Sequence, residues 1–180
     1  MTKTWLIADT HFGHAGVCKF VRADGVTPLR PWDDPDEMDE ALVANWNAVV
    51  RDMDRVYVLG DVAMAKRHLE TIGRCKGRKV LVKGNHDIFK AKDYLEYFDD
   101  IRACVVKKAG DQKVIMSHIP VHPESLGRFG INIHGHLHSN RVMLGEKTED
   151  PRYINVSVEQ INFTPVEFTQ LLSGVKMESY

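Results

Sequence analysis

Residues 80–87 read VLVKGNHD and join a short apolar run to three polar side chains. A valine-rich run that is bounded by glycine is typical of a buried β-strand. Asn85, His86 and Asp87 follow it, and amide oxygens, imidazole nitrogens and carboxylates are all groups that bind metal ions. A strand that ends on possible metal ligands is the pattern from which we interpret the rest of the chain.

Four other apolar runs end in the same way. They are residues 5–8, ending at Asp9 with His11 two positions on; residues 56–60, ending at Asp61; residues 114–117, ending at His118; and residues 131–135, ending at His136 with His138 two positions on. In open α/β sheets the ligand crevice lies outside the carboxyl ends of the strands. We therefore expect these side chains and Asn85 to converge on one rim of a sheet.

The composition is that of a soluble globular protein, and a length of 180 residues predicts a single domain over residues 1–180. A formal net charge of −1 argues against a global electrostatic footprint for nucleic acid or an acidic membrane. Cys18, Cys75 and Cys104 are scattered and odd in number, which favours isolated thiols in a reducing compartment. Because we find neither a signal-peptide pattern nor a stretch long enough to span a bilayer, we expect a cytoplasmic protein with no membrane partner.

Strands alternate with helical stretches along the chain, which indicates an α/β fold. The clearest helix is predicted over residues 36–50, where Met38, Leu42 and Trp46 fall on one stripe and the acidic residues at the start form a solvated first turn. Three shorter helices are predicted, over residues 66–72, 91–98 and 165–175. Residues 109–112 are typical of a turn between two strands, so the sheet is mixed or there are two sheets.

The strand-end residues form a mixed set of carboxylate, amide and imidazole ligands, which suits first-row divalent ions. Asp9 and His11 leave one strand together, at a spacing that lets both face one ion. A carboxylate has two oxygens, so Asp61 can bridge two ions where an imidazole cannot. The set therefore predicts a two-metal site that keeps open positions for water and a phosphate.

Five blocks of the chain, taken in order, resemble the motif of the calcineurin-like metallophosphoesterase superfamily. They are Asp9-x-His11, Gly60-Asp61, Gly84-Asn85-His86-Asp87, His118 and Gly135-His136-x-His138. The resemblance covers residues 4 to about 158, and residues 10–14 resemble a subgroup of small bacterial and phage phosphoesterases. It implies a four-layer α/β/β/α sandwich of two mixed sheets, with a dinuclear metal site at one end of the sheets.

The resemblance also implies a role for each block. The first divalent ion would be bound by Asp9, His11, Asp61 and His138, and the second by Asp61, Asn85, His118 and His136. Manganese is favoured for both ions, with iron, zinc, cobalt and nickel as alternatives. A hydroxide held between the ions would attack phosphorus in line. His86 would stabilise the transition state or protonate the leaving oxygen, with Asp87 orienting its imidazole.

The resemblance implies that the reaction is the metal-dependent hydrolysis of a phosphoester, with a phosphodiester favoured over a monoester. Residues 62–65 read VAMA, whereas the serine/threonine protein phosphatases of the superfamily continue after Gly-Asp as x-Val-Asp-Arg-Gly, which argues against that activity. The expected partner is a small phosphoester such as a nucleotide. Two alternatives stay open: a nuclease acting on single-stranded DNA or RNA, and a non-catalytic scaffold on the same fold, which would typically lack the histidine at position 86.

A few residues outside the five blocks are also candidates for the site. His14 either approaches the substrate or caps the turn that follows it. Arg30 and Arg67 are candidates for binding a substrate phosphate, because a guanidinium pairs with phosphate oxygens bidentately. Asn155 and Ser157 are expected to support the metal ligands by hydrogen bonds from behind.

Overall fold

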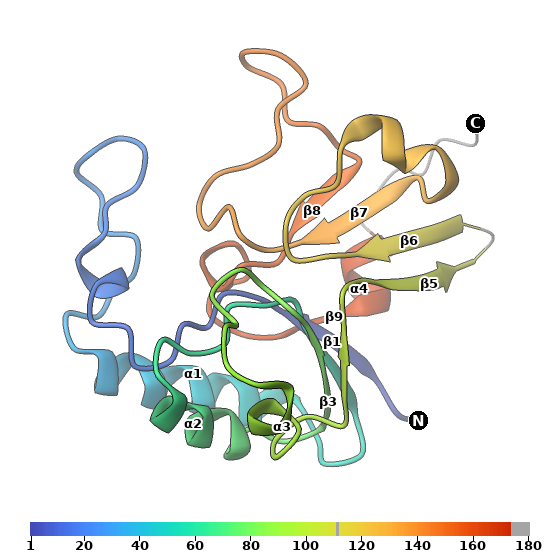
Figure 1. The fold of residues 1–180 in the computed structure, drawn as a ribbon. Coiled ribbons are helices and arrows are strands. Elements are labelled where there is room, and N and C mark those ends of the chain that lie inside the picture. The colour runs from blue at the N-terminus through green and yellow to red at the C-terminus, as the bar shows by residue number, and fades with distance from the viewer. Residues whose placement is uncertain (111, 174–180) are drawn as a thin grey trace.

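The computed structural model describes residues 1–110 and 112–173, and two β-sheets face each other in it (Figure 1). The first sheet contains, in spatial order, β4 (Asp100–Arg102), β3 (Arg78–Val82), β2 (Arg55–Val58), β1 (Thr4–Ile7) and β9 (Val166–Glu167). Strands β1 to β4 are parallel, and β9 pairs antiparallel with β1. The carboxyl ends of the parallel strands therefore lie along one edge of the sheet.

The second sheet contains β5 (Val105–Ala109), β6 (Gln112–Met116), β7 (Ile131–His134) and β8 (Tyr153–Asn155), in that order. Strands β5 and β6 form an antiparallel hairpin, whereas β6, β7 and β8 are parallel. The predicted α/β fold of two mixed sheets is thus confirmed, and so is the predicted hairpin. Asp111, within the predicted turn, lies outside the described residues.

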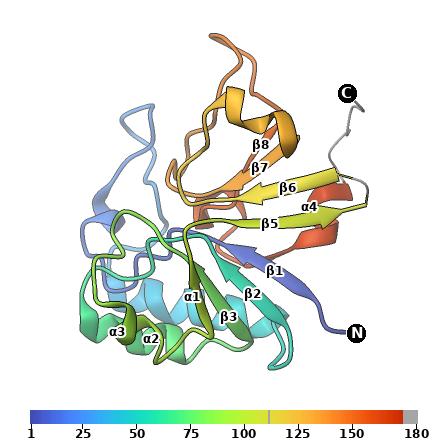
Figure 2. The same cartoon turned by 45° about the vertical axis from the view of Figure 1, so that its right-hand side comes forward.

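Helices cover the outer face of the first sheet (Figure 2). They are α1 (Pro35–Val49), α2 (Leu69–Gly73), which follows the 3-10 helix η2 (Lys66–His68), and α3 (Ala91–Tyr94). Helix α1 confirms the strongest helix prediction. The Asp34 side chain caps it by accepting a hydrogen bond from the Asp36 amide at 2.7 Å, and Pro35 occupies the first turn, where a missing amide hydrogen costs nothing.

One acidic residue of α1 is not solvated as predicted. Asp39 is 6% exposed, and its two carboxylate oxygens accept from the Gly13 amide at 3.0 and 3.1 Å. Burial raises the pKa of Asp39 to about 6. Asp39 therefore ties α1 to the loop after β1, which carries His11 and His14.

The other predicted helices are shorter than expected. The helix predicted over 66–72 divides into η2 and α2, and that over 91–98 is α-helical only in α3. The helix predicted over 165–175 begins instead with β9, because residues 166 and 167 pair with the edge of β1; α4 (Phe168–Ser173) follows, and residues 174–175 lie outside the described part of the chain. Among the described residues, no helix is both long and apolar enough to cross a membrane.

The alternation of side chains along β1 shows how the layers are held together. Trp5 and Ile7 belong to the hydrophobic core that contains the buried face of α1, whereas Leu6 and Ala8 belong to the core between the two sheets. Successive side chains of a strand point to opposite faces, so a strand that is apolar at every position can be buried on both sides. The first sheet is therefore an inner layer, between the helices and the second sheet.

The outer face of the second sheet is covered by the segment between β6 and β7, which contains the 3-10 helix η3 (Pro123–Arg128). The Val121 amide donates to Asn132 Oδ1 at 3.0 Å, and the Tyr153 hydroxyl donates to the Val121 carbonyl at 2.8 Å. Asn132 and His134 are fully buried on this face. The fourth layer is thus a short 3-10 helix and its flanking loop.

Candidate metal centre

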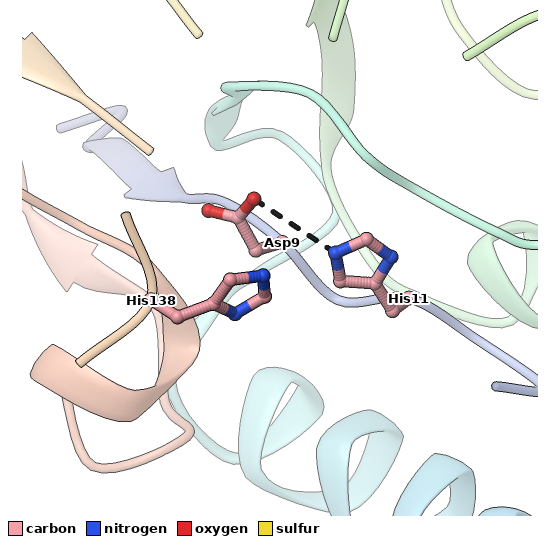
Figure 3. Close-up of side chains that lie close together, drawn as sticks. All are labelled: Asp9, His11 and His138. Atoms are coloured by element: carbon pink, nitrogen blue, oxygen red, sulfur yellow. Dashed lines mark ion pairs between the residues drawn. The ribbon is translucent and has the colours of Figure 1, made fainter. Parts of the chain in front are cut away.

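Three of the predicted ligands meet at the ends of β1 and β7. Asp9 and His11 lie just after β1, and His138 lies in the loop after β7 (Figure 3). One ligand atom of each residue lies within 4.8 Å of those of the other two, and Asp9 Oδ1 is 4.0 Å from His11 Nε2. The imidazoles of His11 and His138 are stacked, with their centroids 5.2 Å apart. These residues form the first group that could hold a metal ion.

A second group of the same kind consists of Asp61, His118 and His136, whose ligand atoms also lie within 4.8 Å of one another. Asp61 Oδ2 is 3.4 Å from His118 Nε2 and 3.7 Å from His11 Nε2, so this oxygen stands between the two groups. Asn85 borders the second group, because its Oδ1 is 2.9 Å from His118 Nε2. The structure therefore brings together all seven strand-end residues of the predicted site.

The backbone at the site is strained. Positive φ angles occur at Asp9 (58°), His11 (49°), Asp61 (55°), His136 (70°) and His138 (49°). Residues with a Cβ atom rarely adopt this conformation, and each such residue costs on the order of 1–3 kcal/mol. The sharp turns that result direct side chains from separate strands toward one centre. Strain of this kind gathers at functional sites, where the surrounding structure holds it in place.

Glycines allow the separate turns to approach one another closely. A Cβ atom at Gly135 would lie 2.5 Å from Asp9 Oδ2, and one at Gly60 would lie 2.5 Å from His118 Nδ1. A Cβ atom at Gly84 would collide with Asp61 Oδ1. The glycines of the three blocks are thus needed because the ligand side chains occupy the space that any larger residue would fill.

The donor atoms around His118 fit a metal ion. His118 Nδ1 lies 2.8 Å from the Leu59 carbonyl oxygen, which can only accept, so Nδ1 carries the proton. In the neutral ring Nε2 then presents a lone pair, and it faces the oxygens of Asn85 and Asp61. A proton on Nε2 or a metal ion can satisfy these lone pairs. Although burial lowers the pKa of His118, its hydrogen bond to Asp61 and the charges of Asp9 and Asp61 raise the pKa overall. The mixed nitrogen and oxygen set suits a first-row divalent ion.

Two buried polar atoms of the first group lack a hydrogen-bond partner within the described part of the chain. Asp9 Oδ2 accepts from the His136 amide at 2.9 Å and from Ser157 Oγ at 2.8 Å, but Asp9 Oδ1 and His11 Nδ1 have no such partner among residues 1–110 and 112–173. Burial raises the pKa of Asp9 to about 6 and lowers the pKa of His11. A bound cation would offset the cost of burying the Asp9 carboxylate and would find His11 already neutral, the form that binds metal.

Glu159, in the 3-10 helix η4 (Val158–Gln160), supports the first group and was missed by sequence reasoning. Its side chain is fully buried, and its Oε1 lies 3.1 Å from His138 Nδ1. The carboxylate accepts, so His138 Nδ1 donates and Nε2 is left with a lone pair for a metal ion. A single glutamate outside the five blocks carries no signal in the sequence, since only folding brings it behind His138.

Arg30 has a buried position that does not fit the predicted role in binding a substrate phosphate. It is 1% exposed, and its Nε and Nη2 both lie 2.8 Å from Glu159 Oε1. Its Nη1 and Nη2 also donate to the carbonyl oxygens of Thr10 and Asp9, at 2.9 and 2.6 Å. Because the guanidinium is buried and bonded on every side, Arg30 instead holds the turn after β1 against Glu159.

Asp87 does not orient the His86 imidazole as predicted. Asp87 is 1% exposed, and its oxygens accept from three backbone amides, those of Asp61 (2.9 Å), Val62 (3.0 Å) and Gly84 (2.8 Å). Among the described residues, neither oxygen bonds to the His86 ring. Asp87 thus fixes the two turns that carry Asp61 and Asn85. His86 itself is exposed, with its ring centroid 5.6 Å from that of His11.

The remaining candidates take different positions. His14 holds the turn that follows it: its Nδ1 accepts from the amides of Gly16 (2.9 Å) and Val17 (3.1 Å), at the start of the 3-10 helix η1 (Val17–Lys19). Its ring lies 5.6 Å from that of His11, and contact with a substrate stays a prediction. Arg67 is exposed in η2, and its Nε donates to His68 Nε2 at 3.2 Å. Among the described residues, its side chain makes no hydrogen bond or ion pair with the two candidate metal-binding groups.

The supporting hydrogen bonds predicted for β8 and the residues after it are confirmed. Ser157 Oγ donates to Asp9 Oδ2, and Asn155 Nδ2 donates to the His138 carbonyl at 3.0 Å. Asn155 Oδ1 in turn accepts from the Ser157 backbone amide at 2.9 Å. These contacts fix the positions of the first-group residues from behind, and such contacts commonly tune metal affinity.

Comparison with known proteins gives relatives over the whole chain, although no protein-family model matches. The uncharacterized protein MJ1445 of Methanocaldococcus jannaschii is 37% identical over 185 aligned positions, which cover 98% of this chain and 93% of that protein. The solved structure of protein AQ665, of unknown function, from Aquifex aeolicus shares the fold: the TM-score is 0.68 at 24% identity, over 96% of this chain and 99% of that one. A solved archaeal phosphodiesterase is similar at a TM-score of 0.48 and 18% identity, over 86% of this chain and 82% of that one.

Proposed function

This chain belongs to the protein family of MJ1445 from Methanocaldococcus jannaschii, and we propose that it is a dinuclear metal-dependent phosphoesterase that favours phosphodiesters. The proposal rests on one observation: two Asp/His groups lie at the carboxyl ends of strands from two sheets, and Asp61 Oδ2 of the second group lies close to His11 of the first group as well as to His118 of its own. We propose manganese as the metal and a small phosphoester, of which a nucleotide is one candidate, as the substrate.

The residues of the centre have distinct tasks in this proposal. Asp9, His11 and His138 would hold one ion, and Asn85, His118 and His136 the other, with Asp61 shared. A bound pair of divalent ions would supply Lewis-acid chemistry, lowering the pKa of water and neutralising charge on the phosphoryl oxygens. Glu159 and the Leu59 carbonyl keep the protons of His138 and His118 on Nδ1, so that both Nε2 atoms face the centre.

The proposal predicts hydrolysis of bis(p-nitrophenyl) phosphate in the presence of Mn²⁺, at a higher kcat/KM than for p-nitrophenyl phosphate. Metal analysis of the protein should find close to two ions per chain after loading with Mn²⁺. Protein treated with a chelator should lose activity and regain it when Mn²⁺ is added back. Single-stranded DNA and RNA belong in the same assay, because faster cleavage of either would favour the nuclease alternative. Absence of hydrolysis of every substrate by metal-loaded protein would favour the non-catalytic scaffold.

His86→Ala is expected to lower kcat by about 10²–10⁴-fold. This is the usual contribution of a side chain that donates a proton to, or accepts one from, the reacting group in the transition state. The exposed ring lies beside His11 at the mouth of the centre, and His86 bonds to Asp61 only through its backbone amide, at 2.8 Å. Alanine keeps that amide, so both metal ions should remain, which metal analysis can measure. His122→Ala, an exposed histidine of η3's N-terminal cap, is the matched control. Loss of metal from His86→Ala would make His86 a ligand and overturn the assigned role.

A further inference from the structure

A cavity of about 590 Å³ opens beside the metal centre, at the carboxyl ends of β3 and β4. Its size lies in the range of about 300–1,000 Å³ that is usual for small-molecule sites. Lys83, Asn85, Ile88, Ile101 and Arg102 are among the residues that line it. None of the roles assigned to the metal centre uses this space.

Asn85 connects the cavity to the centre. It lines the cavity, and its Oδ1 is 2.9 Å from His118 Nε2 in the second group. Gly84 lines the cavity too, and lies against Asp61. A phosphoester whose phosphorus is held at the metal centre could therefore extend one of its substituents directly into the cavity.

The positively charged side chains of Lys83 and Arg102 belong to the residues that line the cavity, and the carboxylates among the described residues neutralise them only in part. The Lys83 ammonium makes no hydrogen bond or ion pair with the described residues, and its backbone amide donates to the Arg102 carbonyl at 2.9 Å, which places the two residues side by side. Arg102 Nε donates to Asp100 Oδ2 at 2.6 Å, which leaves its two terminal nitrogens without a partner among those residues. The carboxylate in the lining, that of Asp87, is bound by three backbone amides.

The rest of the lining is apolar. Ile88 is 76% exposed and Ile101 is half-buried. An isoleucine that is three-quarters exposed at the wall of a cavity offers contact area to a carbon skeleton. The cavity thus combines a positive region with an apolar wall, next to the place where the proposed reaction occurs.

We infer that this cavity binds a second, non-reacting phosphate group of the substrate, with the carbon skeleton between the two phosphates against Ile88 and Ile101. The inference rests on the proposed phosphoesterase function and names its substrate class: a phosphodiester that carries a further phosphate, as a nucleotide with two phosphorylated positions does. Lys83 and the terminal nitrogens of Arg102 supply charge-assisted hydrogen bonds to that phosphate.

A matched pair of chromogenic diesters tests the inference. Thymidine 5′-(p-nitrophenyl phosphate) and its 3′-phosphorylated counterpart release the same leaving group and differ only in the second phosphate. In the unaltered protein loaded with Mn²⁺, the second phosphate should raise kcat/KM about tenfold or more, mainly through KM. Lys83→Met should bring the ratio of the two kcat/KM values close to one. Lys108→Met, which removes an exposed lysine of β5 outside the cavity lining, should keep the ratio of the unaltered protein.

A binding measurement on metal-free protein provides a second readout. Thymidine 3′,5′-bisphosphate should bind about tenfold more weakly to Lys83→Met than to Lys108→Met in isothermal titration calorimetry. If the unaltered protein hydrolyses both diesters with the same kcat/KM, the inference is wrong while the phosphoesterase proposal stands. If it hydrolyses neither diester nor bis(p-nitrophenyl) phosphate, the proposed function fails and the inference fails with it.

Discussion

Asp61→Asn is expected to reduce phosphodiester hydrolysis by about a thousandfold or more and to lower the metal content of the protein. Asp61 Oδ2 is the oxygen that stands within 4 Å of both His11 Nε2 and His118 Nε2, and Asp61 is 2% exposed. In the proposed centre, removing this charge would take a shared anionic ligand from both ions. The transition-state stabilisation of a two-metal centre amounts to several kcal/mol, and each 1.36 kcal/mol changes the rate tenfold. Metal analysis and kcat on bis(p-nitrophenyl) phosphate give the two measurements.

Asparagine is the informative replacement at this position for a backbone reason. Asp61 has a φ of 55°, a conformation that asparagine tolerates far better than alanine does. Its side-chain oxygen can still accept from the His86 amide, as Asp61 Oδ1 does at 2.8 Å. Asp52→Asn, at an exposed aspartate near the start of β2, is the matched control and should leave activity and metal content unchanged. If Asp61→Asn keeps two ions per chain and normal turnover, Asp61 is not a shared ligand.

Arg30→Met is expected to lower the free energy of unfolding by about 3–5 kcal/mol, because it removes one partner of a buried ion pair and leaves the other charge uncompensated. The Arg30 and Glu159 side chains are both fully buried, and the guanidinium also bonds to the carbonyl oxygens of Asp9 and Thr10. The loss should appear as a lower midpoint of urea unfolding, with an unchanged m-value, in metal-free protein.

Two further variants separate this structural role from substrate binding. Arg30→Met combined with Glu159→Leu removes both charges and should be less destabilised than Arg30→Met alone, since no unpaired carboxylate remains. Arg22→Met, at an exposed arginine of the loop before α1, should unfold at the same urea concentration as the unaltered protein. A normal unfolding midpoint for Arg30→Met together with a raised KM would restore the phosphate-binding role predicted from the sequence.

Local patterns predicted β1, β2 and β3 because each contains an apolar run that leads to a polar residue at the strand end, whereas the polar strand β4 was not predicted. The run from Trp5 to Ala8 is buried on both faces, and that burial is what its uninterrupted apolar sequence indicated. The helix predictions held where an amphipathic stripe was long, as in α1. They failed at residues 166–167, because the edge of β1 offered backbone hydrogen bonds that a local helix preference could not outweigh.

The candidate ligands could be named from the sequence because each directly follows a strand, and parallel strands present their carboxyl ends at one edge. The roles of Asp87 and Arg30 could not be predicted in this way. Asp87 stands next to His86 in the sequence, but its carboxylate is oriented by the amides of Asp61 and Val62, which lie on a different strand end. Two residues that adjoin in the sequence lie close together, but their side-chain atoms can bind to different parts of the structure.

The sequence by itself determined the apolar strands, the edge at which the site forms and the chemical nature of its donor atoms, because these follow from local apolar runs and from residue type. The arrangement in two mixed sheets was implied by the family resemblance, since the residues alone left one mixed sheet or two sheets open. Only the tertiary structure decided which lone pairs face one another and which are already bonded. The positive φ angles after the strands, the Glu159 carboxylate behind His138 and the cavity beside Asn85 all depend on contacts between segments far apart in the chain. Such contacts are set by the packing of the whole molecule, which no short stretch of residues encodes.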